Sequence, residues 1–346
     1  MISFESDYNN GMLPEILENL SKTNDDKTSG YGFDPYSESA KNKIRKAVGN
    51  EEADVYFLVG GTQTNTTVID SLLLGCEGVI CVETSHIEVH ESGAVEAFGH
   101  KVLTISSSDS KLKAEDLVAY METFLGDETH PHMVQPGMVY ISLPTELGML
   151  YTKQELADLY STCRKYQLRL FIDGARLGYG LMSKACDYDL PYVAKHCDVF
   201  YIGGTKVGAM FGEAVVFSGM KAPKYFFTNV KRHGALLAKG RMLGIQFDTL
   251  FTDDLYFKIS KHAIDMAAGI RKIFAKHNIP LAYDSPTNQQ FVILSPTLYQ
   301  ALSKLVAFEI WEKRNEQEIV CRFVTSWATK EEELEELDKA IVKCLS

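Results

Sequence analysis

The sequence predicts an α/β fold, in which a large domain built on a mainly parallel sheet is joined to a small α+β domain. Between about residues 54 and 218, short β-rich apolar runs alternate with segments of helical character. This alternation is typical of a parallel sheet covered by helices. After residue 218 the pattern changes to longer helical stretches. The 346 residues, 45% of them hydrophobic, exceed the usual size of one domain and can bury a large core.

The strands expected in the large domain are short runs rich in β-branched and aromatic residues. They are residues 55–59, 79–82, 101–105, 138–143, 169–173, 199–203 and 214–218. Helices are expected at 62–74 and 113–125. Another helix is expected after Thr152, because Thr152 and Glu155 have the spacing of a capping box.

The second part of the chain predicts a separate α+β unit. Its expected elements are helices at roughly 228–250 and 253–277 and strands at 291–295 and 320–326. Thr329 and Glu332 repeat the capping-box spacing before a C-terminal helix with apolar residues at helical intervals. We therefore expect a large domain of residues 22–250 and a small domain of residues 1–21 and 251–346.

Composition limits the partners and the compartment. A formal net charge of -11 argues against the positive field that non-specific nucleic-acid binding needs. The seven cysteines are scattered without a C-x-x-C pair, which suits a reducing compartment. The N-terminus lacks the basic and apolar regions of a signal peptide, and no apolar run approaches about 18 residues. We expect a cytoplasmic protein that binds neither nucleic acid nor membranes.

The segment FIDGARLGYGL, residues 171–181, places polar groups at the end of a strand. Ligands of α/β sheets bind at the carboxyl ends of strands. Asp173 there could keep a pyridinium nitrogen protonated, and Arg176 could bind a carboxylate or phosphate through two hydrogen bonds. The alternative for Asp173 is a turn or cap residue.

The next strand, residues 199–203, runs into Gly204, Thr205 and Lys206. A lysine in this setting lies close to backbone and is partly desolvated, which lowers its pKa and frees the amine for imine formation. A lone lysine is more often a surface residue. The strand-end Asp173 one strand earlier favours the chemical interpretation.

Two further strand ends carry candidate groups. Gly61 and Thr62 follow the strand 55–59 at a helix start, where backbone N–H groups and the helix dipole bind phosphate; a plain helix cap is the alternative. His86 follows the strand 79–82 and could stack on a ring or transfer a proton, or be structural. The turn matches neither the dinucleotide fingerprint nor the P-loop.

In their order and spacing, these segments resemble the threonine aldolase and β-eliminating lyase family of fold-type I pyridoxal-phosphate enzymes. The resemblance runs from the N-terminus to about Trp327. The motifs are SDYNNGMLPEIL (6–17), YGFDP (31–35), the GGT turn, HIEVHESGAV (86–95), SLPTELGMLY (142–151), DGAR, GGTK with GEAVVF, and KRHGALLAKGRMLG (231–244). The resemblance implies that pyridoxal 5'-phosphate is the cofactor.

The resemblance also implies roles for single residues. Those for the cofactor are Lys206 as the Schiff-base lysine, Asp173 at the pyridinium nitrogen, His86 stacked on the ring, Gly61 and Thr62 at the phosphate, and Thr205 and Arg176 nearby. Those for the substrate are Arg176, Arg322, Ser6 and Tyr31. Tyr31, Lys239 and Arg241 would approach the site from a neighbouring subunit, which implies a homodimer or homotetramer. A solvated amphipathic helix remains the alternative for the basic segment.

One departure concerns proton transfer. Many family members carry Asn-Thr-His-Asn at a strand end, where this chain has Pro144-Thr145-Glu146-Leu147. A carboxylate therefore replaces an imidazole, and the candidate bases are His86, His90 and Glu146. The pair His130 and His132 lacks partners at zinc spacing, so no metal is assigned.

The resemblance implies retro-aldol cleavage of a β-hydroxy-α-amino acid, such as threonine or allo-threonine, to glycine and an aldehyde. The same cofactor and fold also serve β-elimination, racemisation and transamination. A catalytically silent cofactor-binding homologue is a further alternative. A nicotinamide dehydrogenase is a remote fourth, because the phosphate turn lacks the expected glycines.

Overall fold

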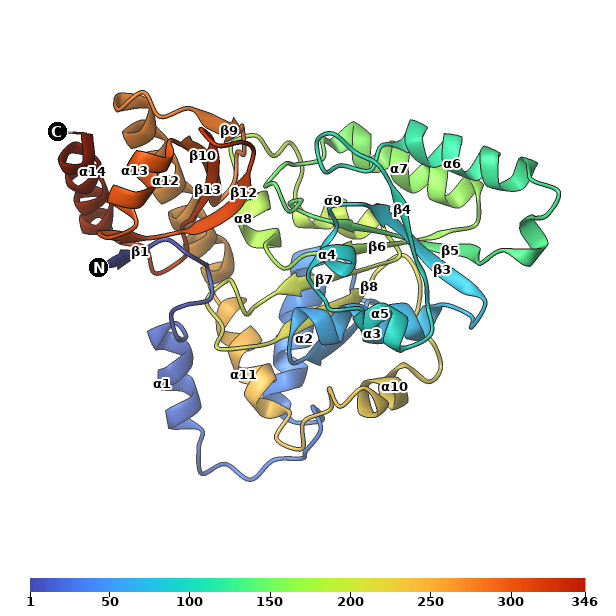
Figure 1. Cartoon of the computed structure of the whole chain (residues 1–346). Helices are drawn as coiled ribbons and strands as arrows, with labels where there is room; N and C mark the ends of the chain where they lie inside the picture. Colours follow the sequence, from blue (N-terminus) through green and yellow to red (C-terminus); the bar gives the residue numbers. More distant parts are fainter. Residues whose placement is uncertain (346) are drawn as a thin grey trace.

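A seven-stranded sheet forms the centre of the larger part of the molecule (Figure 1). The computed structural model describes residues 1–345. The strands are β2 (Asp54–Leu58), β3 (Glu77–Val82), β4 (Val102–Ile105), β5 (Gln135–Ser142), β6 (Arg169–Asp173), β7 (Val199–Gly203) and β8 (Glu213–Phe217). Their order is β2-β8-β7-β6-β5-β3-β4, and only β8 runs antiparallel to its neighbours. The predicted mainly parallel sheet is confirmed.

Helices cover both faces of this sheet (Figure 1). They are α2 (Pro35–Val48), α3 (Gly61–Leu72), α4 (His86–Val89), α5 (Ala94–Ala97), α6 (Ala114–Gly126), α7 (Lys153–Lys165), α8 (Leu177–Leu181) and α9 (Leu190–Lys195), and the turn η1 (His130–His132) follows α6. The predicted capping box of α7 is present: the Thr152 hydroxyl accepts from the Glu155 N–H at 3.2 Å, and the Glu155 carboxylate accepts from the Thr152 N–H at 2.7 Å.

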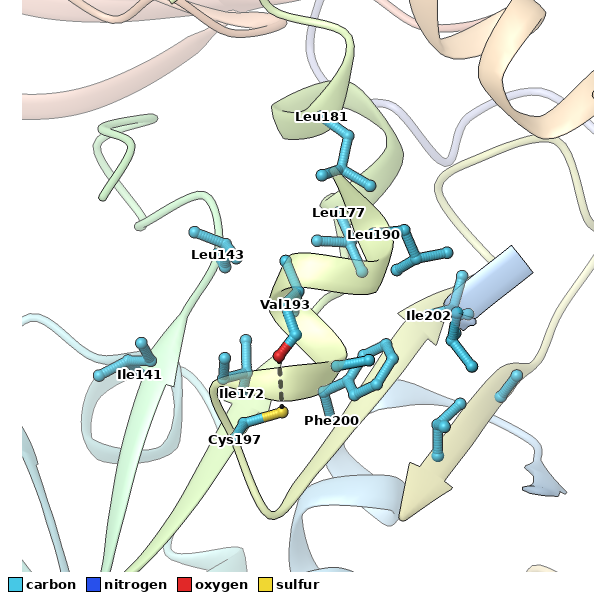
Figure 2. Packing of buried hydrophobic residues seen from close by; sticks show 14 of the residues in the cluster. Ile141, Leu143, Ile172, Leu177, Leu181, Leu190, Val193, Cys197, Phe200 and Ile202 are labelled. Atoms are coloured by element: carbon cyan, nitrogen blue, oxygen red, sulfur yellow. Dashed lines mark hydrogen bonds between the residues drawn. The ribbon is translucent and has the colours of Figure 1, made fainter. Parts of the chain in front are cut away.

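Alternate residues of the central strands point to two separate cores. Ile141 belongs to the core on one face, whereas Tyr140 belongs to the core on the other. Figure 2 shows the first core, where Ile172 and Phe200 from neighbouring strands lie beside Val193 of α9. Burying each such aliphatic or aromatic side chain stabilises the fold by about 1.5–3 kcal/mol, which fixes the strand ends in place.

The second part of the chain forms a four-stranded antiparallel sheet with helices on it. Its elements are α12 (Leu255–Lys276), β9 (Leu281–Tyr283), β10 (Gln289–Leu294), α13 (Pro296–Leu302), β12 (Glu309–Lys313), β13 (Ile319–Val324) and α14 (Glu331–Leu345), in the sheet order β12-β13-β10-β9. Ser346, the last residue of the range expected for the small domain, lies outside the described residues.

The N-terminal segment lies against this second part (Figure 1). Strand β1 (Ile2–Ser3) pairs in parallel with β11 (Val306–Ala307). Phe4 continues the contact, because its N–H donates to Ala307 and its carbonyl accepts from Val324, both at 2.8 Å. The next helix, α1 (Pro14–Lys22), packs instead on α11 (Arg241–Leu250) of the larger part.

Two sequence predictions about helices are wrong. The segment 228–250 is not one helix: α10 (Phe226–Arg232) ends before Gly234, which has a φ of +71°, and α11 starts again after Gly240. Residues 233–240 of the basic segment therefore form a loop between two helices, and the alternative of one amphipathic helix over the segment is wrong. The second capping box is also absent: Thr329 bonds to the Ser326 N–H, and Glu333 caps the Lys330 N–H.

No helix within residues 1–345 combines the length and the apolar character needed to cross a bilayer.

Candidate active site

A cavity of about 250 Å³ lies at the carboxyl ends of the sheet strands. We call it the inner cavity. The last residues of β5 and β6, Ser142 and Asp173, line it, and so does Lys206 just after β7. Other predicted residues that line it are Gly61, Thr62, His86, Glu146, Arg176 and Thr205. Residues that were predicted to lie at separate strand ends, far apart in sequence, are therefore close together in the fold.

Asp173 is held ionised in this cavity. Its carboxylate accepts from the hydroxyls of Tyr140 (2.6 Å) and Tyr201 (2.5 Å), from Asn65 Nδ2 (3.0 Å) and from the N–H of Ala175 (2.9 Å). Burial alone would raise the pKa of Asp173, but the electrostatic contribution of the nearby His86 and the hydrogen bonds from the two tyrosines and Ala175 lower it below its usual value. A fixed, ionised carboxylate is what a protonated pyridine nitrogen requires as a partner.

Lys206 has the lowered basicity that imine chemistry needs. Burial and then the charge of Arg176 lower its pKa, against the attraction of Asp7, Asp173 and Glu213. Its carbonyl accepts from the Tyr179 hydroxyl at 2.6 Å, which fixes the backbone of the turn after β7. The amine is thus presented on a rigid segment.

Glu213, which the sequence analysis missed, lies beside this lysine at the start of β8. Its carboxylate accepts from the Gly204 N–H (3.0 Å) and the Thr205 hydroxyl (2.7 Å). Burial raises the pKa of Glu213, and the same burial lowers the pKa of Lys206. Both shifts favour the neutral forms, so the pair does not place two uncompensated charges in the cavity. The Thr205 hydroxyl both donates to Glu213 and accepts from the Gly212 N–H at 3.0 Å, so protein groups already occupy it.

The turn between β2 and α3 provides a cradle for a phosphate. Gly60 precedes the first turn of the 12-residue helix α3, and Gly61 and Thr62 form its first positions. A Cβ at Gly61 would lie 3.3 Å from the Tyr201 hydroxyl, so glycine keeps this wall of the cavity open. Free backbone N–H groups and the helix dipole favour an anion there. Together with Asp173 and Lys206, these residues fit pyridoxal phosphate.

His86 starts α4, directly after the end of β3. Its ring Nδ1 lies 2.7 Å from Oε1 of Glu91, and Oε1 also accepts from Asn65 Nδ2 at 2.7 Å. The backbone N–H of His86 donates to Glu146 at 2.8 Å. The histidine is therefore fixed through its ring and through its backbone.

Glu146 follows β5 in the segment that departs from the family pattern. Its Oε1 accepts from the Ser142 hydroxyl (2.6 Å) and from the His86 N–H (2.8 Å). Burial raises the pKa of Glu146, opposed by the Ser142 hydrogen bond and assisted by the charge of Asp173. A carboxyl group of raised pKa keeps its proton to higher pH than an ordinary glutamate and can act in proton transfer. The third candidate base, His90, lines only the outer cavity described next, and burial lowers its pKa.

An outer cavity of about 590 Å³ adjoins the inner one. His86, Glu146, Arg176 and Lys206 line both cavities, so they lie at the boundary between them. The other residues that line the outer cavity are Tyr8, Val89, His90, Gln289, Glu309, Ile310, Trp311, Glu312 and Arg322. The small domain's β12 and β13 thus supply one wall, and the N-terminal segment supplies Tyr8.

Both arginines expected to bind a carboxylate already have an acidic partner. Arg176 donates to the two oxygens of Asp7, from Nε at 2.7 Å and from Nη2 at 3.1 Å, and Asp7 also accepts from Asn288 at 2.9 Å. Arg322 donates to Gln289 at 2.9 Å and to Glu309, its cross-strand neighbour. Arg322 is buried and its Nε has no hydrogen-bond partner among residues 1–345, so a donor remains for a ligand.

The remaining predicted residues differ in their surroundings. The Ser6 hydroxyl is buried and has no partner within the described chain. Tyr31 is exposed and its N–H bonds to Ala238, so it lies beside the loop that contains Lys239. Neither lines the inner or the outer cavity of this chain. Arg241 is used internally, since it donates to the carbonyls of Thr23 and Asp26.

Several site residues escaped the sequence analysis. They are Asp7, Asn65, Glu91, Tyr140, Tyr201, Glu213, Gln289 and Glu309. A signal existed for the two tyrosines, because each lies two or three residues before the end of a strand whose terminus was identified. Asp7 and Glu309 gave no such signal, since their arginine partners lie in other parts of the chain.

Comparison with known proteins adds independent evidence. A family model described as β-eliminating lyase matches residues 4–295. A low specificity L-threonine aldolase of Pseudomonas sp. is 31% identical over 96% of this chain and 95% of its own length. The structure of a Leishmania major threonine aldolase superposes with a TM-score of 0.96 at 38% identity over the whole of both chains. A Listeria monocytogenes protein, a putative L-allo-threonine aldolase, shares the fold, with a TM-score of 0.76 at 19% identity over 99% of this chain and 96% of its own.

Proposed function

The chain belongs to the β-eliminating lyase family, and from this premise we propose that it is a pyridoxal-phosphate-dependent lyase of the threonine aldolase type. Its reaction is the cleavage of a β-hydroxy-α-amino acid, such as threonine or allo-threonine, to glycine and an aldehyde. The observation that supports this best is the cavity in which Asp173 and Lys206 come together with the phosphate cradle of α3. The relatives named above support the choice of substrate.

The residues of the inner cavity would hold the cofactor. Lys206 would bind it covalently through the ε-amine, Asp173 would pair with its ring nitrogen, and His86 would lie against its ring. The N-terminus of α3, at Gly61 and Thr62, binds its phosphate. When bound, pyridoxal phosphate supplies the electron sink that allows a bond at Cα to break.

The substrate carboxylate is received between the two arginines. Arg322 has a buried Nε without a partner among residues 1–345, and Arg176 lies at the boundary of the two cavities. Ser6 lines neither cavity of this chain, but its buried hydroxyl, which has no partner in the described part of the chain, would add a donor from the N-terminal segment next to Asp7. This anchoring points the β-substituent toward the outer cavity, whose walls contain His90 and Trp311.

Aldol cleavage requires removal of the β-hydroxyl proton. His86 and Glu146 both line the two cavities and are linked through the His86 backbone. We assign the proton acceptor to His86, because its ring is anchored to a carboxylate. Glu146, with its raised pKa, is the group that returns a proton.

The proposal extends to the assembly. Tyr31, Phe33 and Phe227 are exposed apolar side chains at the edge of a small groove, and the loop with Lys239 lies beside them. Since Tyr31 and Lys239 do not line this chain's own cavities, they serve the site of a neighbouring subunit in a homodimer or homotetramer. We also propose the expected division into a large domain of residues 22–250 and a small domain of residues 1–21 and 251–346, in which α1 packs across onto α11 of the large domain. The proposed location is the cytoplasm.

The decisive experiment measures glycine and acetaldehyde released from L-threonine and L-allo-threonine, with and without added pyridoxal phosphate. We expect both products, dependent on the cofactor, and we expect Lys206→Ala to lose both turnover and the visible absorbance of the bound cofactor. Lys184→Ala is the matched control for a lysine outside the cavity. An active Lys206→Ala enzyme that keeps the absorbance would refute the assignment.

A second candidate is another reaction of the same cofactor: β-elimination, racemisation or transamination. The shared electron sink supports it, and pyruvate, ammonia or an inverted amino acid in place of glycine would identify it. A catalytically silent homologue would bind the cofactor and release no product.

A further inference from the structure

Glu91 is a buried carboxylate to which neither the sequence nor the relatives give a role. It follows α4 in a turn where Ser92 and Gly93 have φ angles of +55° and +72°. Its side chain has no exposed surface. Oε1 lies within hydrogen-bond distance of Asn65 Nδ2 and of His86 Nδ1, both at 2.7 Å, while Oε2 has no hydrogen-bond partner among residues 1–345. A buried polar atom without a partner costs stability, which indicates that this side chain serves the site.

The hydrogen bonds around Glu91 fix the direction of one proton. Asn65 donates to Oε1 through its amide Nδ2 at 2.7 Å. Oε1 is thus an acceptor in this contact, and its other contact, with His86 Nδ1 at 2.7 Å, is satisfied when Nδ1 carries a proton and donates it to the same oxygen. In the neutral imidazole Nε2 is then the nitrogen with the free lone pair.

The same amide joins this pair to the anchored carboxylate of the site. Asn65 Nδ2 also donates to Asp173 at 3.0 Å, so one NH₂ group lies between two buried carboxylates. It joins the two side chains and so fixes His86 relative to Asp173. The other charged or titratable groups near His86 contact it differently: Glu146 bonds its backbone N–H, the His90 ring is 5.6 Å away, and Arg176 and Lys206 share its cavities.

We propose that Glu91 is a positioning residue that holds His86 in the Nδ1–H tautomer, so that Nε2 accepts the β-hydroxyl proton of the substrate. The tautomer of His86 is inferred from the geometry alone. The acceptance of the substrate proton by Nε2 rests on the proposed function. It distinguishes His86 from His90 and Glu146 as proton acceptor by a contact of the ring itself. Glu91 acts through the histidine.

The test uses the full chain loaded with pyridoxal phosphate and two substitutions. Glu91→Leu removes the acceptor, whereas Glu91→Gln keeps an oxygen that can still accept from Nδ1. Glu88→Gln, at an exposed glutamate of α4 three residues before Glu91, is the matched control. Nitrogen-15 NMR of the histidine rings reports which ring nitrogen is protonated, and the signals absent from His86→Gln identify His86.

In the wild-type protein we expect Nδ1 to be protonated and Nε2 to be free. In Glu91→Leu this preference is lost and kcat falls by about 10–100-fold with KM little changed, the usual effect of losing such an orienting partner. Glu91→Gln should keep the tautomer and much of the activity, and it remains informative if the leucine variant does not fold.

Two results would overturn the inference. One is a neutral His86 protonated on Nε2 in the wild type, and the other is an unchanged kcat in Glu91→Leu. A wild-type enzyme that does not cleave threonine or allo-threonine would instead refute the proposed function, and the NMR spectrum would still decide the tautomer.

Discussion

Replacing Arg176 with methionine should destabilise the protein strongly, because it leaves Asp7 as a buried charge without its main partner. The Asp7 side chain has no exposed surface and that of Arg176 is 13% exposed. Two hydrogen bonds join them, and only the Asn288 amide would remain as a donor to Asp7. Removing one member of a buried ion pair costs about 3–5 kcal/mol. We expect that loss in the free energy of unfolding, measured in urea by circular dichroism.

The double variant Asp7→Asn/Arg176→Met separates this effect from loss of packing. It removes both charges, and the new amide can still accept from Asn288, so it should recover at least about 2 kcal/mol relative to Arg176→Met. Lys261→Met is the control, because Lys261 forms an exposed pair with Asp265 and should cost at most about 1 kcal/mol.

The free energy of unfolding of Arg176→Met should depend on pH in the opposite direction to the contribution that Asp7 makes in the wild type. In the wild type the pKa of Asp7 is lowered: burial raises it, but Arg176 and Lys206 outweigh burial. This contributes stability above the unfolded pKa of about 3.9 that is lost as the pH falls through the folded pKa. Without Arg176, burial dominates and the folded pKa rises, so the variant should gain stability as the pH falls from 8 toward 5. A deficit that does not change with pH, together with additive single variants, would refute this reasoning.

Three further predictions concern the site and the helix packing. Asp173→Asn should lower kcat by about 10²-fold or more, since a neutral amide cannot hold a protonated ring nitrogen; a kcat equal to the wild type contradicts the assignment. Glu309→Gln should lower KM by up to about fivefold at constant kcat, because a partly exposed partner of about 1 kcal/mol no longer competes for the substrate-binding arginine, whereas Glu316→Gln, at an exposed residue that lines neither cavity, should leave KM unchanged. Gly244→Ala should lower stability by about 1–3 kcal/mol, because its Cβ would lie 2.6 Å from the backbone of α2; Gly126→Ala, with nothing within 4 Å, is the control, and equal melting temperatures would contradict the packing argument.

The sequence predicted the strands of the larger part closely, because each is an apolar run bounded by turn residues. β6 and β7 lie at the expected residues, and Asp173 and Lys206 follow from their ends. The positions of these groups in one cavity were therefore predictable, while their chemical roles stay proposals. The break between α10 and α11 was not foreseen, because Gly234 interrupts a segment whose basic residues recur at helical spacing.

The partners of the site residues could not be predicted in the same way. The sequence pattern gives no sign that Asn65 is more than an ordinary helix residue. Only the packing of α3 places its amide between Glu91 and Asp173. Glu309 faces Arg322 because of the register of β12 and β13. Register depends on the whole small sheet, and one sequence does not fix it.

The pairing of β1 with β11 and the position of Arg322 on β13 have a consequence for synthesis of the chain. During translation, β2 to β8 emerge first, so a nascent chain holds Asp173 and Lys206 well before Arg322 leaves the ribosome. The N-terminal residues that border the site have no strand to pair with until β11 has been made. A product released before β13 would thus contain the elements of the cofactor cavity and lack half of the carboxylate anchor. The carboxylate anchor is therefore the last part of the site to be completed as the chain is made.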